Sequence, residues 1–230
     1  KSKMHAIGSE VVDGVVAAVR QAEQSLSGLV IWHQPPFAVG ANLAQVAEGC
    51  AAGDFAQLDR YVAAFQQAGQ ALKYAAVPVV AAVQGMALGG GCEFAMQATR
   101  RVVALESYMG LVEAGVGLIP AGGGCKEFAL QAAEWAGRTA TPAELMAFVQ
   151  PVFMNIATAK VSKSAHEAIG YGFAKPSDTV LFHNDELLFV AIREARALAD
   201  AGYAPRQPAR GIPVAGRAGI AAMEMTLVNM

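Results

Sequence analysis

The sequence predicts an α/β fold in which buried strands alternate with amphipathic helices. Three short apolar runs, each bounded by turn residues, are typical of buried strands: Leu29–Trp32, 79–83 and 101–105. Between them, apolar residues recur at steps of three and four positions, which is the period of a helix. The 230 residues are 54% hydrophobic and 16% charged, a composition typical of one globular domain with a sizeable core. Strands that alternate with helices in this way favour an α/β domain.

Two helices flank the first predicted strand. Ser9 can cap a helix whose apolar positions follow helical spacing: Val12, Val15, Val16 and Val19. After the strand Leu29–Trp32, Asp54 opens the clearest helix of the chain, which continues to Tyr74. Its apolar stripe consists of Phe55, Leu58, Val62, Phe65 and Leu72. This stripe is either core or the wall of a substrate pocket, because helical spacing alone does not separate the two.

The middle of the chain predicts a strand, a helix and a further strand. Residues 79–83 form the second apolar run, which we expect Gly85 to break. A helix should start near Gly90 and run through Met96. The third strand, 101–105, follows directly.

The last third of the chain is predicted to be mainly helical. One helix covers about 126–135, Pro142 is well placed in the first turn of another, and 164–170 is a short helical piece. A strong helix covers 185–201, and Gly202 is expected to cap its C-terminal end. Its expected inward positions are Leu188, Ile192, Ala195 and Leu198.

The chain is expected to divide into a folded domain and an irregular tail. Residues 1–203 should form the domain with its C-terminal helices, whereas 204–230 should be an irregular tail, since Pro and Gly are frequent from Pro205 onward.

Charge and cysteine usage exclude several classes of function. With 17 Lys and Arg against 19 Asp and Glu, the net charge of −2 gives no case for binding nucleic acid or an anionic membrane. Cys50, Cys92 and Cys125 form no close pair, and the histidines are scattered, so neither a disulfide framework nor a metal site is expected. No signal peptide or membrane span is visible, and a reducing cytoplasmic setting is expected.

Two glutamates occupy glycine-rich, otherwise apolar stretches. Glu93 ends the run Gly-Gly-Gly-Cys-Glu, and Glu113 lies at the centre of residues 110–115. A buried carboxylate costs several kcal/mol unless it is partnered, so a role in acid/base chemistry is indicated. Small-residue segments follow the first two strands, at 37–43 and 85–93. There a ligand can approach backbone N–H groups closely, and a helix starting near Gly90 would favour a developing oxyanion.

At these residues the chain resembles the crotonase family, also called the enoyl-CoA hydratase/isomerase superfamily. The family signature Phe-x-x-Gly-Ala-Asp-Leu is matched at 37–43, with Asn42 in the Asp place. The later signatures are matched at 84–93, 113–124 and 164–173, so the resemblance covers nearly the whole chain. It implies a crotonase-like (ClpP/crotonase) fold, a repeated β-β-α spiral with C-terminal helices.

Within this family the chain most resembles the hydratase part of fused 3-hydroxyacyl-CoA dehydrogenase/enoyl-CoA hydratase proteins. Residues 2–8 and 110–120 carry the resemblance to this subgroup. The resemblance implies that the chain is cut from a longer protein and that the first strand of the fold precedes residue 1. The sequence has no Gly-x-Gly-x-x-Gly fingerprint after a first strand, so NAD is expected to bind a dehydrogenase part outside this chain.

The resemblance also implies a role for each matched residue. The N–H groups of Ala41 and Gly90 would form an oxyanion hole for the thioester oxygen of an acyl-CoA substrate. Glu93 and Glu113 would be the catalytic pair that holds a water molecule. The implied substrate-binding residues are Ala41, Asn42, Leu43, Gly89 and Gly90. Neither a metal nor a redox cofactor is implied, and the chain is expected to act as a homo-oligomer or beside a partner domain.

Two residues depart from the family pattern. Asn42 replaces an acid, which we expect to change loop hydrogen bonding more than chemistry, because the required donor is the backbone of Ala41. His5 stands where the family usually has Asn, near the loop that meets the CoA adenine, so it bears on CoA affinity.

Simpler interpretations stand beside these roles. Glu93 could be an acid favoured at a helix start, Glu113 a salt-bridge partner in the core, and the run 89–91 a turn. We interpret Gly122–Gly124 as structural rather than ligand-binding, and Cys92 as a small buried hydrophobe.

The functional prediction is an enoyl-CoA hydratase of fatty acid β-oxidation. The alternatives are an enoyl-CoA isomerase or another acyl-CoA enolate enzyme, and a catalytically silent acyl-CoA-binding module. A serine hydrolase is disfavoured because no Gly-x-Ser-x-Gly elbow occurs.

Overall fold

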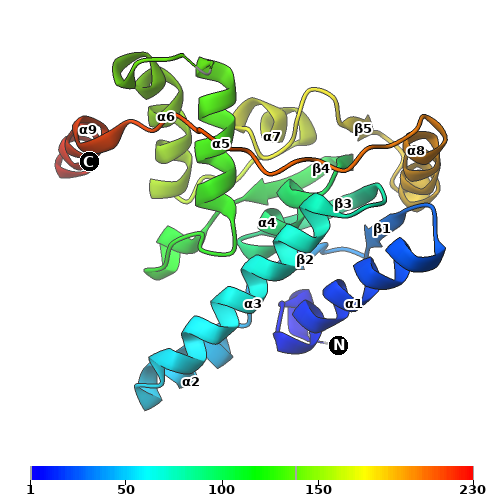
Figure 1. Cartoon of the computed structure of the whole chain (residues 1–230). Coiled ribbons are helices and arrows are strands. Elements are labelled where there is room, and N and C mark those ends of the chain that lie inside the picture. Colours follow the sequence, from blue (N-terminus) through cyan, green and yellow to red (C-terminus); the bar gives the residue numbers. More distant parts are fainter. Residues whose placement is uncertain (1, 138, 230) are drawn as a thin grey trace.

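The strands form one parallel sheet at the centre of the molecule (Figure 1). The computed structural model describes residues 2–137 and 139–229; residues 1, 138 and 230 lie outside that description. Within the described residues the sheet has five strands in the order β1-β3-β4-β5, and β2 pairs with the end of β3. The strands are Leu29–Trp32 (β1), Ala38–Val39 (β2), Val79–Leu88 (β3), Arg100–Gly110 (β4) and Thr179–Leu181 (β5). The predicted α/β class is therefore confirmed.

Helices cover both faces of this sheet. The α-helices are Ser9–Ser25 (α1), Leu43–Ala52 (α2), Phe55–Tyr74 (α3), Gly90–Gln97 (α4), Gly124–Ala136 (α5), Pro142–Ala157 (α6), Ala165–Tyr171 (α7), Leu187–Asp200 (α8) and Gly216–Val228 (α9). Short 3₁₀ turns are Lys3–His5 (η1), Glu113–Val116 (η2) and Asn184–Glu186 (η3). The helix predicted to open at Asp54 is confirmed, since the Asp54 carboxylate caps α3 by accepting the Gln57 N–H at 2.9 Å.

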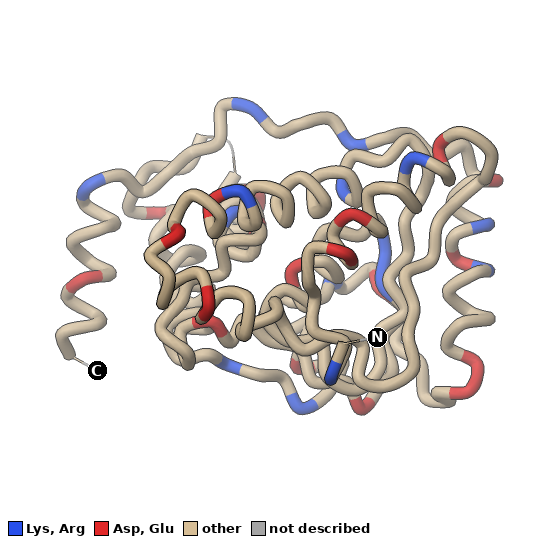
Figure 2. The backbone as a smooth tube through the Cα atoms, turned by 90° about the horizontal axis from the view of Figure 1, so that it is seen from below, with Lys and Arg blue, Asp and Glu red and all other residues tan. Residues whose placement is uncertain are grey.

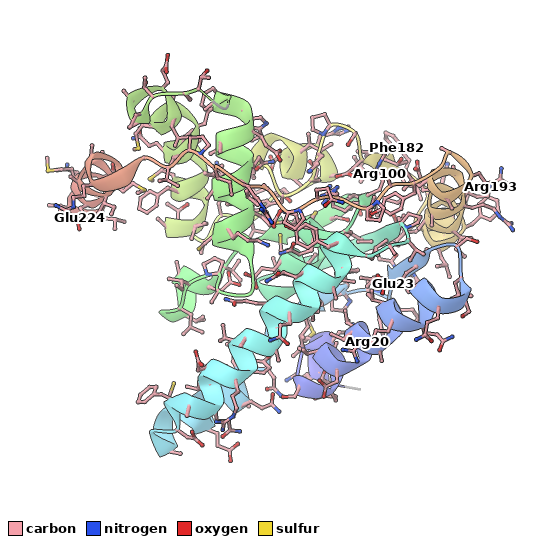
Figure 3. The ribbon with its side chains drawn as sticks, viewed as in Figure 1. Arg20, Glu23, Arg100, Phe182, Arg193 and Glu224 are labelled. Atoms are coloured by element: carbon pink, nitrogen blue, oxygen red, sulfur yellow. The ribbon has the colours of Figure 1, made fainter. Side chains whose placement is uncertain are left out.

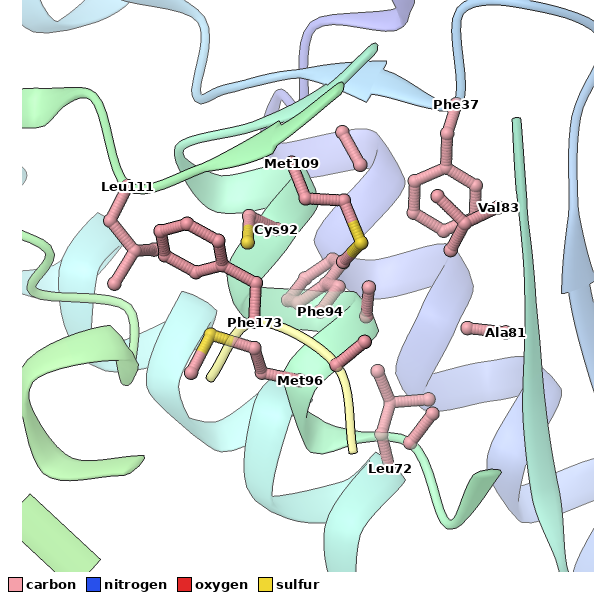
Figure 4. Packing of buried hydrophobic residues seen from close by; sticks show 14 of the residues in the cluster. Phe37, Leu72, Ala81, Val83, Cys92, Phe94, Met96, Met109, Leu111 and Phe173 are labelled. Atoms are coloured by element: carbon pink, nitrogen blue, oxygen red, sulfur yellow. The ribbon is translucent and has the colours of Figure 1, made fainter. Parts of the chain in front are cut away.

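Side chains of β3 and β4 point alternately to the two faces of the sheet, and this alternation divides the core into two layers. Val79, Ala81 and Val83 of β3 contribute to the larger layer, which also contains Phe65, Phe94 and Phe173 and is drawn in Figure 4. Val80 and Ala82 point to the opposite face, where Leu187, Ala191 and Ala195 of α8 cover them. Cys92 is fully buried in the larger layer, as predicted for a small hydrophobe.

The prediction that Gly85 breaks the second strand is wrong. The strand β3 continues to Leu88, and the register with β4 shifts between Val83 and Gly85. Gly85 has φ 64°, and a Cβ there would come within 3.3 Å of Pro35 Cβ. Glycine therefore accommodates an irregularity within a continuing strand, and β3 carries its chain on to the site.

Three smaller predictions about helices are corrected. Ser9 is the first residue of α1, Gly8 occupies the cap position, and no side chain caps this end. Ile192 is 50% exposed, because α8 turns Leu187 and Ala191 toward the sheet instead. The C-cap of α8 is Ala201, and Gly202 follows it with a positive φ of 77°.

The tail is irregular only in its first part. Residues 204–215 run as an extended segment across the molecule, drawn in orange in Figure 1, but Gly216–Val228 forms α9. The prediction of an irregular 204–230 is thus wrong for α9, which packs on α6 and places Gly219 against Met146 Sδ. Within the described residues no helix is both long and apolar enough to cross a membrane.

Charged residues of both signs are distributed over the backbone (Figure 2). Figure 3 shows Arg193 on α8 and Glu224 on α9 projecting from opposite ends of the molecule. This dispersion agrees with the small net charge of −2.

Candidate active site

The glycine run before α4 brings the start of this helix against two neighbouring segments. A Cβ on Gly90 would lie 2.6 Å from Phe65 Cζ, and one on Gly91 would lie 2.3 Å from the Ala38 carbonyl oxygen. Gly89 has a positive φ of 51° and donates its N–H to the Gly110 carbonyl at 2.8 Å. The run 89–91 is therefore more than a turn, because close packing on both sides requires glycine.

Backbone contacts hold Ala41 beside the start of α4. Ile7 accepts the Asn42 N–H and donates its own N–H to the Gly40 carbonyl, both at 2.9 Å. In the described part of the chain, the Ala41 N–H between these two contacts makes no hydrogen bond. The Ala41 nitrogen would lie 3.5 Å from a Cβ placed on Gly90. Because Gly90 is the first residue of α4, its N–H has no partner within the helix. The Ala41 nitrogen and the start of α4 therefore lie close together, and the role of these two N–H groups as an oxyanion hole stays a prediction.

A cavity of about 330 Å³ opens at these donors. Ala41, Leu43, Gly89, Gly90 and both glutamates line it. Its other walls come from the ends of β2 and β3, from α2 and α3, and from the segment after β4: Val39, Gly40, Leu88, Val46, Cys50, Leu58, Tyr61, Val62, Phe65, Val112, Val116, Leu118, Ile119, Ala121 and Gly122. The cavity is thus mostly apolar with a few convergent polar groups, as is usual for small-molecule sites.

Glu93 lies in the first turn of α4 and is only 3% exposed. Its Oε1 accepts the Gly124 N–H at 2.8 Å, and a Cβ on Gly122 would come within 2.4 Å of its Oε2. Burial and the nearby charge of Glu113 raise the pKa of Glu93 to about 7, although hydrogen bonding by the backbone of residues 122–124 acts in the opposite direction. Near neutral pH, Glu93 can therefore both hold and release a proton.

Glu113 approaches the same cavity from η2. A Cβ on Gly89 would lie 3.1 Å from Glu113 Oε1, and Glu113 Oε2 is a buried oxygen without a hydrogen-bond partner among the described residues. Burial raises the pKa of Glu113. In the part of the chain that is described, neither glutamate forms an ion pair, so the salt-bridge interpretation of Glu113 is wrong.

The two departures from the family pattern lie outside the cavity lining. The Asn42 side chain accepts the Ala44 N–H at 3.2 Å and caps α2, so this predicted substrate-binding residue has a local structural role. His5 Nδ1 lies 2.7 Å from the Pro36 carbonyl oxygen, and its ring packs on that of His33 at 3.6 Å.

The structure adds Tyr61, which the sequence did not single out, and assigns part of the α3 stripe to the cavity. Tyr61 and Phe65 of α3 line the cavity, and the Tyr61 hydroxyl donates to the Ile7 carbonyl at 2.6 Å. The stripe on α3 is both core and pocket wall, since Leu72 is fully buried whereas Leu58 and Val62 line the cavity. Gly124 binds Glu93, so the interpretation of Gly122–Gly124 as structural agrees with the geometry, although Gly122 also lines the cavity.

Solved structures of similar proteins share this arrangement of strands and helices. An enoyl-CoA hydratase from Bacillus anthracis is 22% identical, with a TM-score of 0.65 over 85% of this chain and 68% of its own. DspI of Pseudomonas aeruginosa is 21% identical, with a TM-score of 0.68 over 100% of this chain and 88% of its own. The predicted crotonase-like fold is confirmed by these similarities.

The family model for "Enoyl-CoA hydratase/isomerase" matches residues 1–138. The chain belongs to this family. A Bacillus subtilis protein named "Probable 3-hydroxyacyl-CoA dehydrogenase" is 40% identical over 96% of this chain, which spans 27% of that protein. A Shewanella halifaxensis "Fatty acid oxidation complex subunit alpha" is 35% identical over 51% of this chain and 16% of its own length. The chain thus spans about a quarter, or less, of these relatives.

Proposed function

We propose that this chain is an enoyl-CoA hydratase, which adds water to a trans-2-enoyl-CoA in syn fashion in fatty acid β-oxidation. The observation that carries the proposal is the convergence of Glu93 and Glu113 on one apolar cavity beside the N–H groups of Ala41 and Gly90. Two acids supply the proton acceptor and the proton donor that hydration needs. A single acid would suffice for moving a double bond.

The effect of Glu113 on the pKa of Glu93 supports the assignment of one carboxyl group as proton acceptor and the other as proton donor. Since the charge of Glu113 raises the pKa of Glu93, the pair favours a state with one proton near neutral pH. The ionised carboxylate takes a proton from water while the water oxygen bonds to the β-carbon. The π electrons then move toward the thioester oxygen, and the protonated carboxyl group gives its proton to the α-carbon.

The backbone donors act on the thioester oxygen in this scheme. The N–H groups of Ala41 and Gly90 stabilise the negative charge that this oxygen acquires in the enolate-like transition state. Each such donor is typically worth a factor of ~10²–10³ in rate. No metal or redox cofactor enters the proposed reaction, because water and the acyl-CoA thioester supply all of its atoms.

We also propose that the chain is the hydratase part of a longer dehydrogenase/hydratase protein. The name of the Bacillus subtilis relative and the 27% of it that this chain spans support this proposal. NAD would then bind outside residues 1–230. Assembly as a homo-oligomer, or against the dehydrogenase part, is proposed on the family resemblance.

The test is hydration of crotonyl-CoA, followed by loss of the absorbance of the conjugated thioester. Glu93→Gln and Glu113→Gln should each lower kcat by ~10²–10⁴, the usual contribution of a general acid or base. Glu106→Gln is the matched control, because this glutamate is exposed on β4. Hydration that survives in either active-site variant would contradict the mechanism.

Two further assays separate the alternatives. Conversion of a 3-enoyl-CoA without hydration of crotonyl-CoA would support an isomerase instead. Calorimetric binding of CoA without turnover of either substrate would support a silent binding module.

A further inference from the structure

A second cavity, of about 410 Å³, lies at the other end of α4. The first turn of α4 lines the carboxylate cavity, whereas Met96 near its last turn lines this second one. Its remaining walls come from the end of α3, one side of α5, residues 172–175 and part of the extended segment before α9. In Figure 1 this orange segment passes across α5 and the end of β4. The two cavities are therefore separate.

Four cationic side chains line the second cavity, and two of them are neutralised. Lys73 donates to both carboxylate oxygens of Glu127 at 2.7 Å, and Glu127 also accepts from Lys126 at 2.9 Å. Arg101 is buried and bonded to Asp178. Neither Lys73 nor Arg101 therefore requires a further anion.

The other two cations are Lys175 and Arg206. In residues 2–137 and 139–229 neither forms an ion pair, and the Lys175 ammonium makes no hydrogen bond. Arg206 donates from one nitrogen to the Thr99 carbonyl at 3.0 Å. Glu134 also lines the cavity, but it is exposed. Burial, followed by the charges of Arg206 and Arg101, lowers the pKa of Lys175, although the charges of Glu134 and Asp178 act in the opposite direction.

The same cavity holds an unmet hydrogen-bond acceptor. Gln131 lines its wall, and Gln131 Oε1 is a buried oxygen without a partner among the described residues. Buried polar atoms in native proteins are normally satisfied by protein, water or ligand.

We propose that this cavity binds a small oxyanion, such as a phosphate or a hydroxylated carboxylate, between Lys175 and Arg206. The planar guanidinium of arginine suits two oxygens of one such group, and the lysine adds a point charge. This site is independent of the hydratase reaction, because its residues lie outside the carboxylate cavity.

The test is isothermal titration calorimetry of inorganic phosphate with the wild-type chain at low ionic strength. We expect a single site in the wild type, at least tenfold weaker binding in Lys175→Gln and in Arg206→Gln, and no binding in the double variant. Arg210→Gln is the matched control, since this exposed arginine lies on the same segment but outside the cavity, and its affinity should not change.

Two controls establish that the site is separate and that the variants are folded. Saturating crotonyl-pantetheine, a thioester without phosphate that is expected at the carboxylate cavity, should leave the phosphate isotherm unchanged, and loss of the isotherm would contradict a separate site. The urea midpoint of each variant reports whether it is folded, and Lys175→Met offers a second neutral replacement of similar length. Absence of phosphate binding to the wild type, or equal binding by all variants, would overturn the proposal.

Discussion

Burial and the nearby charge of Glu113 disfavour the ionised form of Glu93. Its folded-state pKa of about 7 exceeds its ordinary value of 4.5, so the fold favours the neutral form. The corresponding stability is fully present below pH 4.5 and is lost as the pH rises through 7. At 1.36 kcal/mol per pKa unit, the loss is about 3 kcal/mol.

Glu93→Gln should therefore make the protein more stable relative to wild type at pH 8 than at pH 5, by about 2.5 kcal/mol, because part of the loss has already occurred at pH 5. The Gln oxygen can still accept the Gly124 N–H, so the packing is retained. Urea denaturation at both pH values measures this difference, with Glu106→Gln as the exposed control. An equal stability difference at both pH values would mean that the ionisation of Glu93 does not couple to folding.

Gly122 is the second residue at which a small change should have a large effect. A Cβ at this position would lie 2.4 Å from Glu93 Oε2 and 2.6 Å from Phe65 Cδ1, so one of the two must move. Gly122→Ala should lower kcat of crotonyl-CoA hydration by at least tenfold, because displacing a catalytic carboxylate by about 1 Å can cost ~10² in rate.

Gly115→Ala is the matched control for Gly122→Ala. A Cβ on Gly115 meets only Ala159 Cβ, at 3.7 Å, which is ordinary contact. Similar activities of the two variants would show that the carboxylate is not confined as described.

At the residue scale the sequence predicted the charged part of the site but left open whether the α3 stripe is core or pocket wall. Glu93 and Glu113 stand out because carboxylates are rare in glycine-rich apolar stretches. Phe65 belongs to a predicted apolar stripe that is equally compatible with plain core, and Tyr61 was not among the predicted members of that stripe. Which members of a stripe face a cavity depends on what packs opposite them, and local sequence does not contain that information.

At the element scale, α3 was predicted to the residue, whereas α2, β5 and α9 were not predicted. The helix α3 has a capping Asp54 and a long stripe, both of which are local signals. The strand β5 has three residues and exists through its pairing with β4. In α9, Gly216 and Gly219 argue against a helix, and packing on α6 overrides that preference.

The loop that carries Ala41 depends on contacts with two distant elements. Ile7 bonds on both sides of Ala41, and the Tyr61 hydroxyl of α3 bonds to the same Ile7 carbonyl at 2.6 Å. Tyr61→Phe removes that hydroxyl and keeps the ring, so we expect a loss of about 1 kcal/mol in transition-state binding, or roughly fivefold in kcat.

Steady-state hydration kinetics can distinguish this positioning role from a general structural one. KM should change little in Tyr61→Phe, because the backbone donor is needed most in the transition state. Tyr108→Phe, on an exposed tyrosine of β4, is the control. A rise in KM with unchanged kcat would indicate that Tyr61 acts on substrate binding instead.

At the scale of the whole molecule, Arg101 ties together elements that are distant in sequence. It donates to the Ala95 and Met96 carbonyls at the end of α4, at 3.1 and 3.2 Å, and it pairs with Asp178 before β5. Asp178 also accepts the Lys175 N–H at 2.6 Å. The position of α4, which starts at the carboxylate cavity and ends at the second cavity, therefore depends on this one buried pair.

Asp178→Asn should lower the free energy of unfolding by about 3–5 kcal/mol, because it leaves the Arg101 charge buried and unpaired. Arg101 is 1% exposed, so water cannot replace the lost carboxylate without opening the core. Urea denaturation measures the loss, with Asp200→Asn on the exposed end of α8 as the control. If Asp178→Asn unfolds at the same urea concentration as wild type, the pair does not hold α4 in place. If instead the free energy of unfolding falls while kcat of crotonyl-CoA hydration per folded molecule is unchanged, the pair stabilises the fold without affecting the position of Glu93.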